Sequence, residues 1–472
     1  MSGAAVQARI SVMTDHHPAP HPDQQPSHCP ATQRSIDRGR RRLLGWLGQA
    51  AAAGLAGLSL RPAQAQQPAA ARRPVVVLTA YPEAVSSRIE SAFEQANPGL
   101  RLQLQWRMPN DALPYLQSPA GAAVDVYWSA SPRSFAALQR AGALRRLSAQ
   151  EVPRDGLPTR IGGTDISDAS GQFLASELAG YGFAYQPQRL AALGLAVPAD
   201  WPELAAPGWA GQIALPVPSR VGYAPVLVDI VLQAFGWQRG WALWSAIAGN
   251  AALVGNGSSF ISDEVASGRR ALGLTIDFFA ASAVASGAPL RFAYPLHGGL
   301  NPGQVAVLAN APHVDGALAF TRFVLSDAGQ ALLGHPSIRK LPVRPSVYAS
   351  LPAGYFNPFD AASHGGYDYD NALGQPRLGL VAALFEQALV ADHAAHADLW
   401  RRLHAAQAAG RDVSAARALL EAPPAAAEVA ADAALAAQFA RLEGSVAAER
   451  SSLEQAWRSA AAQRRAQAAA LL

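Results

Sequence analysis

Residues 75–106 read VVVLTAYPEAVSSRIESAFEQANPGLRLQLQW, and this stretch decides the fold class. Its first four residues are apolar, a run short enough for a buried strand. Pro82 stands where a helix has its first residue, and the apolar side chains after it recur at helical spacing. Asn-Pro-Gly at 97–99 ends that helix, and residues 100–106 then alternate between apolar and polar, as a half-exposed strand does. The stretch therefore predicts a β-α-β unit.

The same alternation recurs further along the chain. Alternating strands and helices predict a mostly parallel sheet covered by helices on both faces. The Pro- and Gly-rich stretch 198–211 separates two such sets, so we expect two α/β lobes. Strands are predicted at 124–128, 213–215, 271–276 and 304–308, and helices at 135–141, 223–235, 237–248 and 313–325.

The N-terminal residues 1–65 have the pattern of an export signal with a long leader. GRRRLL at 39–44 precedes an apolar, Gly- and Ala-rich run that closes on Ala-Gln-Ala at 63–65. This order predicts a signal peptide of the twin-arginine kind, cleaved before Gln66, and hence a periplasmic protein with a linker at 66–73. An uncleaved anchor is the alternative, but the run is only weakly hydrophobic. We expect a mature form that does not span a membrane.

Charge and cysteine content exclude several classes of protein. The chain has 38 basic and 34 acidic residues; seven and three of these lie before residue 66, so the remainder carries 31 of each. A neutral body argues against a nucleic-acid partner. The single cysteine, Cys29, lies in the leader, so the mature chain can form neither a disulfide nor a thiolate metal site. Half the residues are apolar and 15% are charged, which excludes a disordered chain.

The usual catalytic signatures do not occur in the sequence. It contains no G-x-x-x-x-G-K-[ST], H-E-x-x-H, G-x-S-x-G or C-x-x-C motif. The sequence therefore favours a protein that is not an enzyme and has no cofactor.

Polar residues follow several predicted strands at their carboxyl ends, where open α/β sheets bind ligands. Helices that begin there offer unpaired N–H groups, which favour anions. The serine and threonine hydroxyls could instead cap the helices that follow them. Asp277 could bind a hydroxyl or an amine of the ligand, or could cap the helix that follows it. Arg107 and Arg220 offer a guanidinium fork to a carboxylate or phosphate, or are surface arginines. The candidate ligand-binding residues are Thr79, Tyr81, Arg107, Ser129, Arg220, Tyr223, Ser258, Ser259 and Asp277.

The C-terminal segment 376–472, which follows an expected linker at 351–375, is Ala-rich and predicts a helical extension. One apolar stripe in it predicts packing on the lobes or on neighbouring helices, with a partner-docking surface as the alternative. Three further residues, 392, 393 and 396, could hold a metal from one helical face, but with no further ligand evident we interpret them as a solvated polar face. The apolar stripe comprises Leu378, Val381, Phe385 and Leu389.

Several segments together resemble the periplasmic solute-binding proteins of ABC importers, in the cluster that contains iron(III), phosphonate and related anion binders. They are the export signal, residues 75–83, FEQANPG at 93–99, VDVYWS at 124–129, residues 317–332 with SDAGQ at 326–330, and KLPVRP at 340–345. The resemblance covers residues 74–347.

The resemblance implies a type II periplasmic-binding-protein fold, in which two lobes joined by crossover strands close on the ligand like a hinge. Lobe one is then 74–182 with 301–350, and lobe two is 183–300. The crossovers fall at Tyr181–Tyr185 and Phe292–Tyr294.

The resemblance also implies an exported protein that captures a small anionic solute, a phosphorylated or carboxylated acid, for an ABC permease. A periplasmic regulatory protein that senses the ligand and docks on a membrane sensor kinase is one alternative, and a hydrolase or transferase on the same lobes is another. Iron(III) members hold their metal with adjacent tyrosines in the second half of the chain. Here Asp277-Phe278-Phe279 stands in that region, and phenyl rings cannot ligate iron, so iron is disfavoured.

Overall fold

The computed structural model describes residues 73–255, 259–440 and 447–472, which belong to one compact unit, Pro68–Leu472. The predicted signal peptide and nearly all of the linker at 66–73 lie outside the described residues.

The β-α-β unit predicted from residues 75–106 is confirmed. Strand β1 (Val75–Thr79) leads through α1 (Glu83–Ala96) to β2 (Leu102–Trp106), and β1 pairs in parallel with both β2 and β3 (Val126–Ser129). All residues of β1 and β3 are buried, whereas most of β2 is not. The apolar run therefore became a central strand and the alternating run an outer one.

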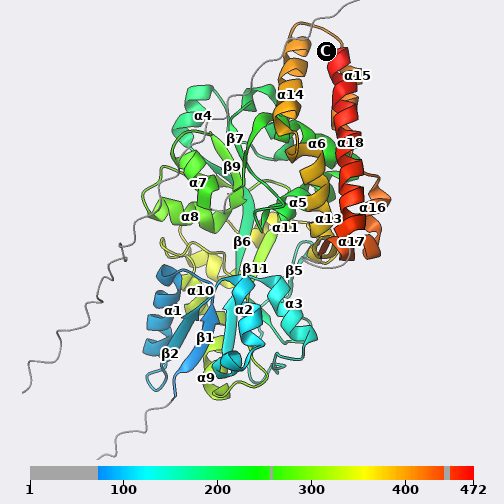
Figure 1. The fold of residues 1–472 in the computed structure, drawn as a ribbon. Coiled ribbons are helices and arrows are strands. Elements are labelled where there is room, and N and C mark those ends of the chain that lie inside the picture. Colours follow the sequence, from blue (N-terminus) through cyan, green and yellow to red (C-terminus); the bar gives the residue numbers. More distant parts are fainter. Residues whose placement is uncertain (1–72, 256–258, 441–446) are drawn as a thin grey trace, which may run out of the picture. The chain divides into compact units, whose positions relative to one another are not determined.

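One mixed sheet continues through both lobes, with β6 running between them (Figure 1). The strand order is β2-β1-β3-β11-β6-β9-β7-β8, and β10 pairs with β6. Only half of its strand pairs are parallel, so the prediction of a mostly parallel sheet was wrong. The antiparallel pairs all involve β6 or β11, because β6 runs from lobe one into lobe two and the chain returns to lobe one through β11, without a helical crossover to a parallel strand. The remaining strands are β6 (Leu174–Tyr185), β7 (Ile213–Pro216), β8 (Ala251–Val254), β9 (Leu272–Ile276), β10 (Arg291–Ala293) and β11 (Leu300–Val307).

Strand β6 connects the two lobes without a break. Its first part, Leu174–Gly180, pairs with β11 in lobe one, and its second part, Tyr181–Tyr185, pairs with β9 in lobe two. The chain returns through β10, which pairs with the end of β6, into β11. Every residue of β6 except its last is buried, so the connection is part of the core of both lobes.

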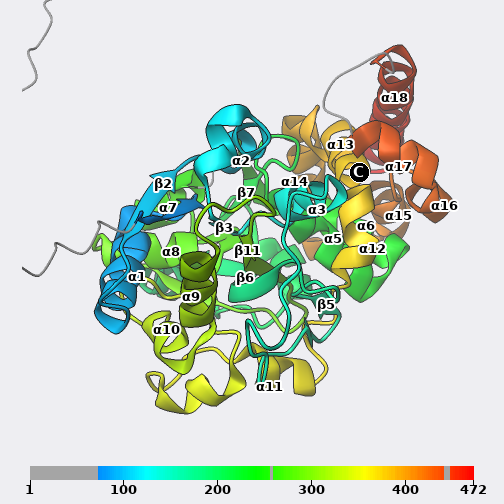
Figure 2. The same ribbon diagram turned by 90° about the horizontal axis from the view of Figure 1, so that it is seen from below.

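Alternate residues of β1 face two different cores in lobe one. Val75 and Val77 pack with Phe93 and Phe320 on the side of α1, whereas Val76 and Leu78 lie in a second cluster on the side of α3. The period-2 geometry of a strand thus places helices on both faces, as predicted. Figure 2 shows the strands between these two groups of helices. The other helices of lobe one are α2 (Pro109–Leu116), α3 (Pro132–Arg140), α9 (Val314–Leu325) and α10 (Asp327–Leu332).

Lobe two has its own core, in which Phe183, Trp201 and Trp244 are fully buried and their rings are in contact. Its helices are α4 (Pro187–Leu193), α5 (Ala224–Phe235), α6 (Trp237–Asn250), α7 (Ser259–Ala266) and α8 (Asp277–Ala285).

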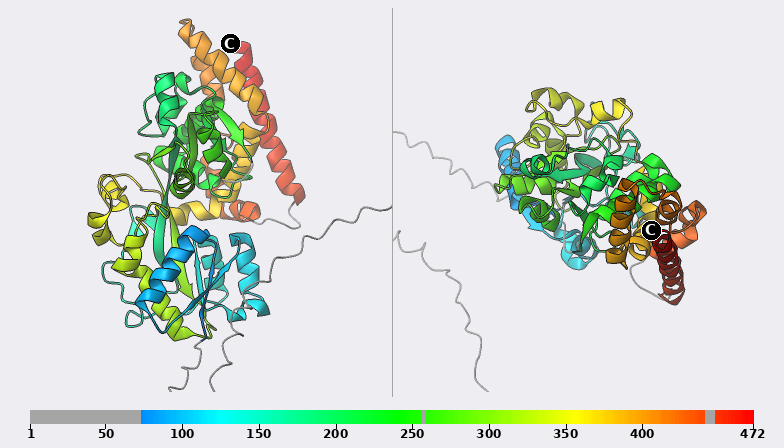
Figure 3. Two further views of the ribbon diagram at one scale, coloured as in Figure 1. Left: turned by 90° about the vertical axis from the view of Figure 1, so that its left-hand side faces the viewer. Right: turned by 90° about the horizontal axis from the view of Figure 1, so that it is seen from above.

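The C-terminal extension begins inside lobe two. Helix α13 (Leu378–Phe385) packs on α5, and Val381 and Phe385 are fully buried in the lobe-two core, which confirms the predicted packing of the apolar stripe. Figure 3 shows the later helices beside lobe two, with α18 running along them. They are α14 (His393–Ala408), α15 (Ser414–Glu421), α16 (Ala427–Ala431), α17 (Ala433–Ala440) and α18 (Ala447–Leu471).

The interpretation of residues 392, 393 and 396 as a solvated polar face was wrong, because α14 turns these residues towards α6 and α18. His396 is 2% exposed, and its Nε2 lies 2.8 Å from the carbonyl oxygen of Ser245. Burial lowers the pKa of His396 to about 4. Asp392 forms an ion pair of 2.6 Å with Arg465 of α18. These side chains attach the extension to lobe two, and the described residues hold no cluster of three metal-ligating side chains.

No single helix in the described ranges is both long and apolar enough to cross a membrane. Residues 371–390 and 393–408 meet that requirement only when taken together, and they are bent by 64° at their junction.

Residues 351–375, expected to be a linker, contact both lobes. Phe356 stacks on Tyr294, which follows β10, with ring centroids 3.8 Å apart. The carbonyl oxygen of Tyr369 accepts a hydrogen bond of 2.9 Å from Thr164 in lobe one, and that of Asp370 accepts one of 3.0 Å from Gln233 in lobe two. The segment includes α11 (Pro358–Ser363) and α12 (Asn371–Gly374).

Candidate ligand site at the lobe junction

Three of the predicted site residues come together at the carboxyl ends of β1 and β3. Thr79 ends β1 and Ser129 ends β3, and both are almost completely buried. The hydroxyl of Thr79 accepts a hydrogen bond of 3.1 Å from the backbone N–H of Tyr81, which holds the turn after β1. The ring of Tyr81 meets that of Trp128 edge-on at 4.6 Å. Parallel pairing of neighbouring strands places these ends side by side.

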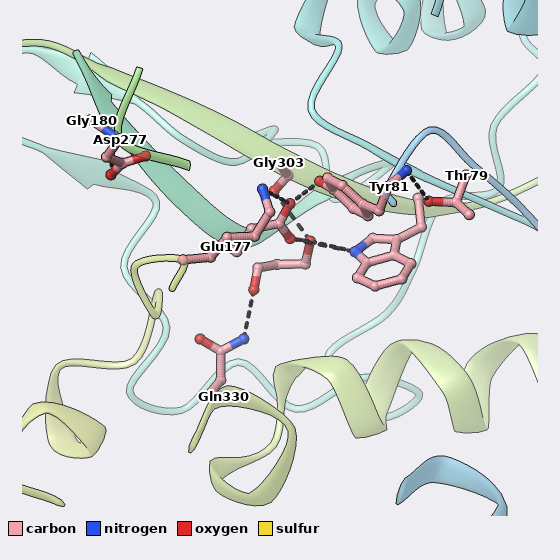
Figure 4. Close-up of polar contacts among 10 residues, drawn as sticks. Thr79, Tyr81, Glu177, Gly180, Asp277, Gly303 and Gln330 are labelled. Atoms are coloured by element: carbon pink, nitrogen blue, oxygen red, sulfur yellow. Dashed lines mark hydrogen bonds and ion pairs between the residues drawn. The ribbon is translucent and has the colours of Figure 1, made fainter. Parts of the chain in front are cut away.

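A buried carboxylate, Glu177 of β6, lies at the centre of this region (Figure 4). It accepts hydrogen bonds from the hydroxyls of Tyr81 and Ser176, and the indole N–H of Trp128 lies 3.4 Å from its Oε2. A Cβ on residue 303 of β11 would overlap the Glu177 carboxylate, so Gly303 is required at that position. Neutral donors from the turn after β1, from β3 and from β6 therefore hold this acid in place.

The cation next to Glu177 is Lys340, which is 3% exposed. Its Nζ lies 3.6 Å from Glu177 Oε1 and 4.4 Å from the ring centroid of Tyr81. On another side it lies 4.9 Å from the ring centroid of Phe278, which belongs to α8 of lobe two. Burial raises the pKa of Glu177 to about 7, although the charge of Lys340 acts in the opposite direction. The ammonium thus contacts both lobes.

Asp277, the first residue of α8, is the buried acid of lobe two. Its Oδ2 accepts a hydrogen bond of 2.8 Å from the backbone N–H of Gly180 (Figure 4). It accepts a second one, of 2.9 Å, from the hydroxyl of Tyr294. Its Oδ1 is buried and has no hydrogen-bond partner among the described residues. Burial raises the pKa of Asp277 to about 6, against the effect of these hydrogen bonds and of Lys340. The N-cap of α8 is Ile276, so Asp277 does not cap this helix.

The other predicted residues of lobe two lie in different surroundings. The hydroxyl of Tyr223 lies 3.1 Å from Thr275 Oγ1 on β9, and its ring lies beside Phe279. Arg220 is more than half exposed and forms an ion pair of 3.8 Å with Glu386 of the extension. Ser259 begins α7, and Ser258 lies outside the described residues.

Arg107 follows β2 at the edge of the same region. Its backbone N–H donates to the carbonyl oxygen of Thr79 at 3.0 Å, and its guanidinium lies over the ring of Tyr115 at 3.7 Å. Its Nε, like Ser129 Oγ, is buried without a hydrogen-bond partner in the described part of the chain. Such unpaired buried groups are costly in a folded protein and are typical of sites that a ligand or water completes.

The two charged residues at the centre, Glu177 and Lys340, are not among the site residues predicted from the sequence. Glu177 interrupts the apolar segment LASELAGYGFAY at 174–185, and a carboxylate inside a buried strand is itself a functional signal. Lys340 begins the segment KLPVRP at 340–345, which contributes to the family resemblance but gives no local sign of a ligand-binding role. Contacts between residues so far apart in the chain are not visible in local spacing.

Comparisons with known proteins agree with this architecture. The family model of the bacterial extracellular solute-binding proteins matches residues 123–355. The phosphoglycerate transport regulatory protein of Salmonella typhimurium is 30% identical over 364 residues, which cover 75% of this chain and 86% of that protein.

Solved structures show the same fold. A Trichodesmium protein in complex with iron and citrate is 18% identical with a TM-score of 0.52, covering 67% of this chain and 99% of that one. The spermidine/putrescine-binding protein of Streptococcus pneumoniae is 13% identical with a TM-score of 0.55, covering 66% and 98%. The chain therefore belongs to the bacterial extracellular solute-binding proteins and has their two-lobed type II periplasmic-binding-protein fold.

Proposed function

We propose that this protein is exported to the periplasm and captures a small anionic solute, a phosphorylated or carboxylated acid, between its lobes for an ABC importer. The observation that carries the proposal is the ammonium of Lys340, which is buried between Tyr81 of lobe one and Phe278 of lobe two. A cation at a lobe junction attracts an anion and is sealed from water when the lobes close.

The groups around Lys340 can complete the recognition of an acid that also carries a hydroxyl. Ser129 Oγ–H has no hydrogen-bond partner within the described ranges and can donate to an anionic oxygen, whereas Asp277 Oδ1 can accept from a hydroxyl of the solute. Hydrogen bonds to charged groups contribute about 1.5–3 kcal/mol each. Three of them can supply most of the roughly 8 kcal/mol that corresponds to micromolar affinity.

The similarity to a protein named for phosphoglycerate transport supports a phosphorylated three-carbon acid as the first ligand to test. A ferric ion is disfavoured, because Phe278 and Phe279, which follow Asp277, offer no metal ligand.

A thermal-shift comparison of small ions tests the proposed function. Since a ligand that binds only the native state raises the melting temperature, 3-phosphoglycerate at about 100 times its Kd should stabilise the protein by about 2.7 kcal/mol. The panel should also contain 2-phosphoglycerate, citrate, ferric citrate and spermidine. Stabilisation by spermidine or ferric ion alone contradicts the proposal. Release of inorganic phosphate from 3-phosphoglycerate by the purified protein contradicts its non-enzymatic part.

Export is tested separately on the full chain in its bacterial host. The predicted cleavage yields a mature protein that begins at Gln66 and is recovered in the periplasmic fraction, and replacement of Arg40, Arg41 and Arg42 by lysine should abolish twin-arginine export. N-terminal sequencing of the recovered protein is the measurement. A full-length protein retained in the membrane fraction would support the uncleaved anchor.

A regulatory role, in which the protein docks on a membrane sensor kinase, is the second candidate. The contact between Arg220 and Glu386 favours it, because it joins the region after β7 to the start of the extension. Substitutions that introduce negative charge on the exposed side of α18, such as Gln463→Glu with Gln467→Glu, should leave solute affinity unchanged and abolish the downstream response. Deletion of the whole extension is unsuitable, because α13 belongs to the lobe-two core.

A further inference from the structure

We propose that Glu177 is the internal counter-ion of Lys340 and that an anionic ligand takes its place, so that Glu177 takes up a proton when the ligand binds. This proposal rests on the proposed function and adds to it a coupling between anion capture and protonation. Neither Glu177 nor Lys340 is among the site residues predicted from the sequence, and the proposal gives each of them a role.

The ammonium of Lys340 has hydrogen-bonding capacity to spare. An ammonium has three donors, and good N–H···O bonds have heavy-atom distances of about 2.7–3.2 Å. Glu177 Oε1 lies 3.6 Å away, and Glu177 is the only carboxylate among the described residues within 4 Å of Nζ. The rings of Tyr81 and Phe278 attract the charge through their faces but offer it no oxygen. A ligand oxygen at hydrogen-bond distance would therefore bind Lys340 better than Glu177 does.

Glu177 can lose Lys340 as a partner without being left unsatisfied. It accepts from the hydroxyls of Tyr81 and Ser176, and Trp128 Nε1 lies within 3.4 Å. Hydroxyl groups accept as well as donate, so the same neighbours can serve a protonated carboxyl group. The network is thus compatible with both protonation states of Glu177.

The charges around Glu177 explain why this residue takes up a proton when an anion binds. The titratable groups that face this cluster are Tyr81 after β1, Lys340 after α10, Asp277 of α8 and Tyr294 after β10. Glu177 and Lys340 are neutral as a pair, so an arriving anion adds negative charge beside a carboxylate that is already buried. A nearby like charge disfavours the ionised form, and protonation of Glu177 removes the repulsion.

The sign of the pH dependence follows from the free protein. The pKa of Glu177 is raised to about 7 by burial, and the ligand raises it further. Affinity should then be constant below about pH 7 and should fall by up to about tenfold per pH unit above it, because each binding event must draw a proton from the solvent. Glu177→Gln has no proton to take up, so its affinity should not show this fall.

Titration calorimetry of the purified protein with 3-phosphoglycerate tests the proposal. Measurements at about pH 8.5 in two buffers of different ionisation enthalpy give the number of protons taken up. The wild type should take up close to one proton per ligand and Glu177→Gln close to none, and the variant should bind more tightly at this pH, by about tenfold or more. The control Glu428→Gln, which changes an exposed residue of α16, should behave like the wild type.

The outcomes separate this proposal from the function on which it rests. Binding of 3-phosphoglycerate without proton uptake, or equal uptake in Glu177→Gln, overturns the proposed coupling and leaves the proposed function intact. Failure of 3-phosphoglycerate, inorganic phosphate and citrate to bind at pH 6 or 8.5 overturns both. The number of protons that the wild type takes up on binding tests the proposed coupling even if Glu177→Gln does not fold.

Discussion

Two buried ion pairs in this protein differ in how completely their hydrogen bonds are formed. In lobe two, Nε and a terminal nitrogen of Arg377 both lie 2.8 Å from Asp229 Oδ1, and Gln233 donates to Oδ2 at 2.9 Å. At the lobe junction, Lys340 lies 3.6 Å from Glu177 with aromatic rings on two sides. Burial and opposite charge are common to both pairs, so neither property identifies a ligand site.

The two pairs differ in unused hydrogen-bond donors. A buried cation with unused N–H donors can bind a ligand, whereas one whose donors are all used stabilises the fold. Asp229 and Arg377 join α5 to the start of the extension. Their hydrogen bonds are already short, so an additional anion would add little binding energy to Arg377. Lys340 gains from any anion that reaches it. Substitutions in the first pair should therefore change stability, and substitutions in the second should change binding.

The largest effect is expected from Arg377→Met. This change leaves Asp229 buried without its cation, and breaking a buried pair in this way costs about 3–5 kcal/mol of unfolding free energy. Urea denaturation is the measurement. Arg101→Met, which breaks an exposed pair with Glu94, is the matched control and should cost less than about 1 kcal/mol. Equal losses in the two variants would show that the lobe-two pair does not hold the fold.

Lys340→Met should weaken the binding of 3-phosphoglycerate by about 100-fold, or about 2.7 kcal/mol, because the ligand loses a charge-assisted hydrogen bond in a buried site. Its unfolding free energy should fall less than that of Arg377→Met, since Glu177 keeps its neutral donors and can bind a proton. Calorimetry measures the ligand affinity of both variants, and urea denaturation measures their unfolding free energies. Unchanged affinity in Lys340→Met would remove the basis of the proposed site.

The pH dependence of stability should also differ at the lobe junction. The folded-state pKa of Glu177, about 7, lies above its unfolded value of about 4.3. The folded state therefore binds more protons between these values, and this residue lowers stability by up to about 1.4 kcal/mol per unit as pH rises through that window. Glu177→Gln should lack this contribution. Urea midpoints at pH 5 and 7 measure it, and parallel changes in variant and wild type would contradict the raised pKa.

The smallest effect is expected from Tyr81→Phe, which removes one neutral donor to Glu177 and keeps the ring beside Lys340. The loss of one hydrogen bond should cost about 1 kcal/mol of stability. Ligand affinity should change much less than in Lys340→Met. A loss of binding as large as that of Lys340→Met would mean that the hydroxyl, and not the ammonium, recognises the ligand.

Much of the fold could be predicted because it depends on local patterns of apolar and polar residues. The β-α-β unit, the two lobes and the helical extension each follow from runs of apolar residues and their spacing. The antiparallel crossovers were missed because the direction of a strand depends on where its ends lie in the fold. The face of α14 was misjudged because polar residues can pack against a neighbouring helix when partners such as Arg465 are present.

The candidate site could be predicted only in part. Strand ends gave Thr79, Tyr81, Ser129 and Asp277, which the structure places at the lobe junction. The partnership of Glu177 with Lys340 spans more than 160 residues, and the ion pair of Arg220 with Glu386 spans a similar distance along the chain. Long-range pairing of charges is set by the folded chain, so spacing along the sequence does not reveal it.

The position of β11 has a consequence for how the protein assembles. In the sheet of lobe one, β11 lies between β3 and β6, yet it is synthesised after the strands of lobe two. A nascent chain that ends before residue 300 thus has a gap in the middle of its first sheet, and the two halves of that sheet cannot pair with each other. The sheet of lobe one is therefore begun before lobe two, and it is closed only after the strands of lobe two have been synthesised.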